Sequence, residues 1–133
     1  MTYLLDTNTC IRYLNGRSPS VRNRLEALTP ADVGLCAVVK AELTYGDARS
    51  LDPARTMAKL EAFWAPYTSL PFDDSCVDTY GRLRAQLEEA GAPIGPNDLM
   101  IAAIAVTHAL TLVTHNTREF ARIPGLSLTD WEA

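Results

Sequence analysis

The chain has 133 residues, of which 47% are hydrophobic and 21% are charged, a composition typical of a globular protein. This length suits one α/β domain, residues 1–133, and is too short for two ordinary domains. No apolar run approaches the length of a membrane span, and no basic region precedes the first apolar residues. We therefore expect neither a membrane span nor a signal peptide.

Net charge and cysteine content bear on the partners and the compartment of the protein. The net charge of −4 argues mildly against a nucleic-acid partner, because domains that bind nucleic acids are usually basic. That objection weakens if three of the acids are neutralised by a metal ion. The cysteines are widely spaced, form no zinc pattern and indicate reduced thiols in a cytoplasmic protein: Cys10, Cys36 and Cys76.

A short apolar strand is predicted at residues 3–5, followed at once by Asp6, Thr7 and Asn8. A continuous apolar run is typical of a buried strand in a parallel sheet. Ligands of open α/β sheets bind beyond the carboxyl ends of the strands, which is where Asp6 falls. Thr7 or Asn8 is predicted to cap the helix that residues 10–14 indicate. Taken alone, Asp6 is better explained as a turn residue or a helix cap.

The next segment is rich in arginine. A turn is predicted at residues 15–19, and Ser18 is a suitable N-cap for the helix that follows. No acid lies between residues 12 and 24, whereas four arginines do: Arg12, Arg17, Arg22 and Arg24. These side chains could form a positive surface that meets phosphates, or an ordinary solvated helix face, and the pattern favours neither.

The middle of the chain supplies a second acid. Residues 33–39 predict a buried strand that runs into a helix, and Glu42 borders the apolar face of that helix. Residues 69–72 predict a short strand that a proline places at the edge of the sheet. Asp73 and Asp74 then begin a long helix. We interpret these two acids as helix caps and not as metal ligands, since carboxylates stabilise helix starts.

A third acid lies at the N-terminal end of a predicted helix. A loop rich in glycine and proline, residues 91–97, leads to Asp98 and the apolar helix at residues 99–106. That helix is apolar nearly all round and should be buried. Asn97 is the expected cap, which leaves Asp98 free to face a polar site.

The last part of the chain repeats the opening pattern. A strand is predicted at residues 109–113, followed by a hydroxyl and an amide, and residues 126–128 predict a further edge strand. Each gap between the polar groups can hold a crossover of a parallel sheet. Clustered carboxylates raise each other's pKa unless a cation compensates, and oxygen ligands suit Mg²⁺ or Mn²⁺. The polar groups that share this setting are Asp6, Glu42, Asp98 and Asn116.

At these positions the sequence resembles the PIN-domain ribonucleases, specifically the VapC-type toxins of bacterial toxin–antitoxin pairs. Asp6 lies in the first motif, Glu42 and Asp98 look like the second and third acids, and Asn116 stands at the fourth position. The resemblance covers essentially the whole chain, and the motifs follow in family order. The fourth position is often Asp in this family, so Asn116 carries one negative charge less.

The resemblance implies an α/β/α sandwich around a central, mainly parallel sheet of about four to five strands. It implies an endoribonuclease, dependent on Mg²⁺ or Mn²⁺, that leaves 5′-phosphate and 3′-hydroxyl ends on structured RNA such as tRNA. It also implies homodimers and inhibition by a VapB-type antitoxin. The implied metal ligands are Asp6, Asp98 and Glu42, joined by Asn116 as a fourth catalytic position. We predict supporting roles for Thr7, Asn8, Asn97 and Thr114, and RNA contacts for Arg12, Arg17 and His115.

Three alternatives compete with this reading. A phosphatase with Asp6 as nucleophile would place a second aspartate where Asn8 stands, and it would need a nearby lysine, of which the chain has only two. A catalytically weak PIN-fold module would bind RNA or protein without cutting, but the retained acids argue against it. A metal-free ribonuclease would use His108 and His115 as general acid and base and would leave a 2′,3′-cyclic phosphate.

Overall fold

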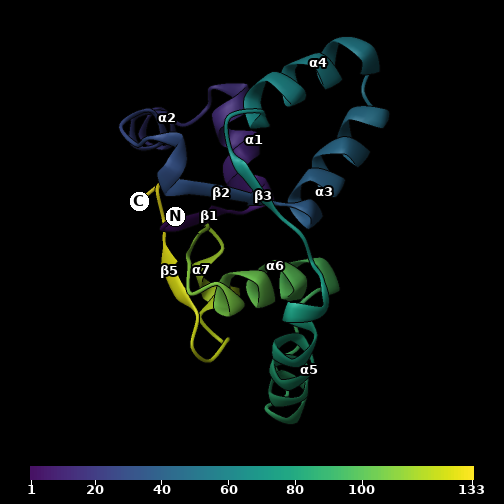
Figure 1. The fold of residues 1–133 in the computed structure, drawn as a ribbon, viewed down its shortest axis with the longest axis vertical. Coiled ribbons are helices and arrows are strands. Elements are labelled where there is room, and N and C mark those ends of the chain that lie inside the picture. The colour runs from purple at the N-terminus through teal and green to yellow at the C-terminus, as the bar shows by residue number, and fades with distance from the viewer.

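The computed structural model describes all residues, 1–133, as five strands and seven α-helices (Figure 1). A 3-10 turn at Pro30–Asp32 precedes the second strand. The elements in chain order are β1 (Tyr3–Leu5), α1 (Thr7–Asn15), α2 (Pro19–Glu26), β2 (Val33–Cys36), α3 (Ala37–Ala48), α4 (Pro53–Trp64), β3 (Thr68–Leu70), α5 (Asp74–Glu89), α6 (Pro96–Thr107), β4 (Thr111–Val113), α7 (Thr117–Phe120) and β5 (Ser127–Thr129).

The strands form one parallel sheet in the order β3-β2-β1-β4-β5. The first strand of the chain therefore lies in the middle, with Leu4 opposite Gly34 of β2 and Leu112 of β4. The predicted edge strands are confirmed as β3 and β5. The prediction that residues 33–39 form a buried strand that runs into a helix is confirmed, since β2 ends at Cys36 and α3 begins directly after it.

Helices cover both faces of the sheet, which confirms the predicted α/β/α sandwich. Figure 1 shows α1, α3 and α4 on one side of the strands and α5 and α6 on the other. The central strand is completely enclosed, since Leu4 and Leu5 are both 0% exposed. The prediction that α6 is buried is also confirmed, because Ile101 and Ile104 are fully enclosed. Burying each such side chain contributes about 1.5–3 kcal/mol to folding.

Local sequence signals explain where several helices begin. The Ser18 side chain accepts a hydrogen bond from the backbone of Val21, as predicted for the N-cap of α2. Asp73 caps α5 by accepting from the backbone N–H of Ser75, which agrees with its interpretation as a cap. The three cysteines are free thiols, and all are buried. No helix combines the length and apolar character needed to cross a membrane.

Candidate metal-dependent active site

Asp6 lies directly beyond the carboxyl end of the central strand and is only 5% exposed. Its Oδ1 accepts a hydrogen bond of 2.8 Å from the backbone N–H of Thr9, so Asp6 is the N-cap of α1. The prediction that Thr7 or Asn8 caps this helix was wrong, because the extended backbone of Asp6 already places its carboxylate over the first turn. The Thr9 hydroxyl donates to the carbonyl of Val113 at 3.2 Å, which ties this turn to β4.

Glu42 reaches the same edge of the sheet from α3. Its Oε1 accepts a hydrogen bond of 2.6 Å from the hydroxyl of Thr7. Glu42 is half-buried, as its place on the border of the apolar face predicted. Thr7 follows Asp6 in the chain, so this contact joins two acidic segments that are 35 residues apart. A hydrogen bond to a carboxylate is strong and fixes its orientation.

Asp98 belongs to the first turn of α6 and is half-buried. The prediction that Asn97 caps this helix was wrong: the N-cap is Gly95, and Pro96 takes the first helical position. Asn97 is exposed and lines a cleft of about 670 Å³ together with Thr7 and Glu42. Because Asp98 does not cap the helix, its carboxylate remains available to the site.

The pKa of Asp98 is raised to about 6, chiefly by burial and then by the negative charges of Glu42, Glu119 and Asp6. The smaller contributions arise because Glu42, Glu119 and Asp6 lie near enough to Asp98 to disfavour its charged form. Burial likewise raises the pKa of Asp6, opposed by hydrogen bonding from Thr114 and Thr9. Clustered acids without a cation destabilise each other's charged forms.

Glu119 lies outside the residue set predicted from the motifs, yet the structure brings it into the acidic cluster. It stands on α7, three residues after Asn116, and its Oε2 accepts a hydrogen bond of 2.9 Å from the Asn116 side-chain amide. The signal available in the sequence was this three-residue spacing across the start of a helix, which puts both side chains on one face. Asn116 therefore holds an acid in place instead of providing the fourth charge itself.

Thr114 connects the two halves of the site. It is fully buried directly after β4, and its Oγ1 accepts a hydrogen bond of 3.0 Å from the backbone N–H of Asn116. The Thr114 side chain also lies close enough to the Asp6 carboxylate to oppose the rise in its pKa, so it lies between the central acid and the turn that carries Glu119. The structure thus puts Thr7 and Thr114 in contact with acids or their supports, whereas Asn8 and Asn97 are exposed at the rim.

The oxygen ligands of this site suit a hard divalent cation. Four carboxylates gather at the carboxyl edge of the sheet: Asp6, Glu42, Asp98 and Glu119. The charges of the other three all contribute to raising the pKa of Asp98, after the larger effect of burial. Mg²⁺ and Mn²⁺ prefer such ligands, and their charge offsets the repulsion. No cysteine takes part, which argues against a zinc site.

The two histidines are too far apart to act as an acid–base pair. His108 follows α6 at its carboxyl end, whereas Asp98 lies in its first turn, a rise of about 15 Å along the helix. His115 follows the carboxyl end of β4, whereas His108 precedes that strand, and His115 contacts Asp130. This separation argues against the metal-free ribonuclease mechanism.

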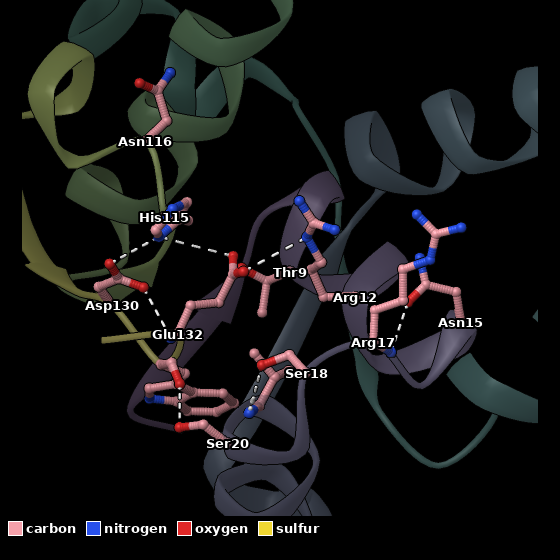
Figure 2. A network of polar contacts seen from close by, with 12 residues as sticks. Thr9, Arg12, Asn15, Arg17, Ser18, Ser20, His115, Asn116, Asp130 and Glu132 are labelled. Carbon is pink, nitrogen blue, oxygen red and sulfur yellow. Dashed lines mark hydrogen bonds and ion pairs between the residues drawn. The ribbon is translucent and has the colours of Figure 1, made fainter.

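His115 and two predicted RNA contacts, Arg12 and Arg17, do lie together. They line a cleft of about 480 Å³ beside the acids. The hydrogen bond with Asp130 raises the pKa of His115, as does the charge of Glu132. Figure 2 shows the side chains of His115 and Arg12 meeting at Glu132.

Known proteins are similar to this chain in both sequence and fold. The PIN domain model matches residues 3–126. The chain is 40% identical to the ribonuclease VapC2 of Rickettsia felis, over 99% of each chain. It is 37% identical to the tRNA(fMet)-specific endonuclease VapC of Salmonella typhimurium, over 98% of each. A crystal structure of VapBC2 from Rickettsia felis, bound to a DNA fragment from their promoter, superposes with a TM-score of 0.91 at 39% identity, covering 98% of this chain and 99% of that one.

Proposed function

Since this chain belongs to the PIN-domain family, in its VapC ribonuclease branch, we propose that it is a divalent-metal-dependent endoribonuclease that hydrolyses structured RNA such as tRNA. One observation supports the metal dependence: four carboxylates come together at the carboxyl edge of the sheet, where the pKa of Asp98 is raised to about 6, chiefly by burial and further by the charges of the other three. Three reduced thiols and an RNA substrate fit action in the cytoplasm.

The side chains divide into ligands and supports. Asp6, Glu42, Asp98 and Glu119 would hold Mg²⁺ or Mn²⁺, which activates water and stabilises the charge that develops on a phosphoryl group. The backbone N–H of Thr9 fixes Asp6, which is therefore oriented before any ligand arrives.

Glu42 and Glu119 are fixed by side chains. The hydroxyl of Thr7 fixes Glu42, and the amide of Asn116 fixes Glu119. Preorganised carboxylates of this kind need little rearrangement to receive a cation.

The partner proposed for this protein is a VapB-type antitoxin, and the proposed assembly is a homodimer. The structural relative from Rickettsia felis is a VapBC2 complex, which supports a toxin–antitoxin pairing here. Helices α1, α3 and α4 also leave an apolar cleft of about 300 Å³ in which Ile11 and Leu14 are exposed. Asp47 borders that cleft with a buried Oδ1 that has no hydrogen-bond partner, so a polar group of the antitoxin could satisfy it.

A cleavage assay tests the proposed function. The purified protein is incubated with a tRNA(fMet) transcript in Mg²⁺, in Mn²⁺ and in excess EDTA, and the new RNA ends are mapped. We expect cleavage with either metal, none in EDTA, and 5′-phosphate and 3′-hydroxyl ends.

Two variants complete the assay. Asp98→Asn should abolish cleavage, and Glu61→Gln on the exposed face of α4 should leave it unchanged. Cleavage that persists in EDTA and leaves a cyclic phosphate would overturn the metal-dependent mechanism in favour of the histidines. Mn²⁺ binding at the acids without cleavage of any RNA tested would instead favour a binding module.

A further inference from the structure

A polar cleft of about 480 Å³ lies beside the acidic cluster, and its charged or titratable lining residues are Arg12, Arg17, His115 and Glu132. Arg12 and Arg17 enter it from α1 and the turn that follows, and His115 enters it from the loop after β4. Asn8 and Asn116 also line the cleft. Asn8 lies two positions after Asp6 in the sequence, and Asn116 lies three positions before Glu119. The cleft therefore lies next to the chain segments that carry Asp6 and Glu119.

A carboxylate occupies the space between the cations. Oε1 of Glu132 lies 3.5 Å from Nε of Arg12, and Oε2 lies 3.8 Å from Nδ1 of His115. Figure 2 shows the Glu132 side chain reaching up from the segment after β5 to meet both. One oxygen thus faces the Arg12 guanidinium and the other the His115 ring, as two oxygens of a phosphate could. Neither distance is short enough for a good hydrogen bond, so the contacts are weak ion pairs.

Arg12 makes the cluster of His115, Asp130 and Glu132 a poor site for a metal ion. Ligand atoms of these three residues lie within 4.8 Å of one another, which on its own would permit a cation. Arg12 already contributes a fixed positive charge at Glu132, and a metal ion there would be repelled by it. Asp130 holds Nδ1 of His115 at 3.0 Å, which orients the ring.

We propose that Arg12, Arg17 and His115 form a subsite for a phosphodiester group of the substrate RNA next to the bond that is cut, and that Glu132 occupies this subsite in the free protein. The inference rests on the proposed ribonuclease function, which it deepens by assigning where the flanking strand lies. An RNA strand that crosses the acids would leave them along the rim that carries Arg12, Arg17 and His115. A phosphate displaces Glu132 because it can approach the guanidinium within hydrogen-bond distance.

The position of Glu132 also couples the subsite to the acids. Its negative charge contributes to raising the pKa of Asp6. When RNA displaces the carboxylate, a phosphate takes over the pairing with Arg12, and the arginine remains neutralised throughout. Glu132 therefore acts as an internal competitor whose removal should favour RNA.

The experiment measures RNA affinity separately from cleavage. Binding of a fluorescent tRNA(fMet) transcript to the metal-free protein is followed by anisotropy in EDTA at several salt concentrations. The variants are Glu132→Gln, Arg12→Gln and Arg12→Lys.

A matched pair on α5 provides the controls. Asp78 and Arg82 form an exposed ion pair of 2.9 Å away from the cleft, so Asp78→Asn and Arg82→Gln change the same charges at a site with no proposed role.

We expect Glu132→Gln to tighten RNA binding several-fold and Arg12→Gln to weaken it. Arg12→Gln should also reduce the slope of log affinity against log salt by about one, the signature of a lost phosphate contact. Arg12→Lys should restore most of the salt dependence, and both α5 variants should match the wild type. Melting temperatures within a degree or two of the wild type exclude a folding defect.

Three results would overturn the subsite. These are unchanged or weaker RNA binding by Glu132→Gln, an Arg12→Gln salt slope equal to that of the wild type, and no RNA binding by the wild type in EDTA. Failure of the ribonuclease function is recognised separately, because it would appear as absent cleavage in Mg²⁺ whatever the binding results are.

Discussion

The side-chain amide of Asn116 donates a hydrogen bond of 2.9 Å to the carboxylate of Glu119. This contact explains how a site with an amide at its fourth motif position still gathers four carboxylates. The amide nitrogen is committed to Glu119, and the amide oxygen remains as a neutral acceptor. Asn116 is thus a positioning residue for Glu119, and the fourth negative charge comes from α7.

The first prediction separates these two residues. Glu119→Gln removes a charge from the cluster and should weaken Mn²⁺ binding about tenfold or more, because each carboxylate interacts directly with the cation. Asn116→Ala keeps the charge but loses its orientation, so its effect should be smaller. Calorimetry with Mn²⁺ ranks the variants, with Glu89→Gln at the exposed end of α5 as the control. If Asn116→Ala proves more damaging than Glu119→Gln, the amide itself is the ligand.

The second prediction concerns the pH dependence of the metal-free protein. The folded-state pKa of Asp98 is about 6, above its ordinary value of 3.8, so the native state binds this proton more tightly than the unfolded state does. Between these two pH values the contribution of Asp98 to stability falls as pH rises, and above pH 6 the charged form destabilises the fold.

Replacement of the acid by its amide should remove this destabilisation. Asp98→Asn should raise the melting temperature of the metal-free protein at pH 7 by several degrees, corresponding to about 1–2 kcal/mol for a half-buried group. The difference from the wild type should vanish near pH 4. Calorimetric scans of both proteins at pH 4 and pH 7 provide the measurement. A stabilisation of equal size at both pH values would mean that charge repulsion is not its cause.

The third prediction follows from the two roles of Asp6. Asp6→Asn retains an acceptor for the Thr9 backbone N–H, and it removes a buried charge. It should abolish cleavage while leaving the metal-free protein at least as stable as the wild type. Asp6→Ala should be inactive too, but it also loses the cap, which costs about 1 kcal/mol. Chemical denaturation that finds Asp6→Ala more stable than Asp6→Asn would contradict the capping role.

The fourth prediction tests the support of Glu42. Thr7→Val keeps the shape of the side chain but removes the hydroxyl that donates to Glu42 at 2.6 Å. A hydrogen bond to a charged group is worth about 1.5–3 kcal/mol, so cleavage should fall about tenfold or more. Thr7→Ser keeps the donor and should restore most of the rate. Equal losses in both variants would point to the methyl group and to packing.

Sequence patterns predicted the parallel sheet and the buried helix α6 because both depend on local apolar runs. The apolar runs at Tyr3–Leu5 and at residues 99–106 indicate buried elements even when the elements that pack against them are unknown. The caps were harder to predict: Asp6, Thr7 and Asn8 are all good capping residues, and the backbone angle that selects Asp6 is set by where β1 ends.

Glu119 and Glu132 were not predicted to belong to the site, and the reason is a different one. Surface glutamates are common on helices and in loops, and only the fold brings Glu132 to Arg12, far away in the chain. The arginine-rich segment gave two equally good readings because its pattern holds no information about which arginines face the acids. The structure places Arg12 and Arg17 in the cleft, and Arg24 lies at a different one with Trp131.

The central place of β1 in the sheet has a consequence for protein synthesis. β4, which pairs with β1 from Tyr3↔Thr111 to Leu5↔Val113, is made more than a hundred residues after Asp6. A nascent chain that stops before β4 holds three of the acids but lacks the strand that aligns them. It also lacks Glu119, which follows β4. Pairings so distant in sequence form late in folding. A cell making this nuclease is therefore exposed to its activity only after β4 and α7 have been made.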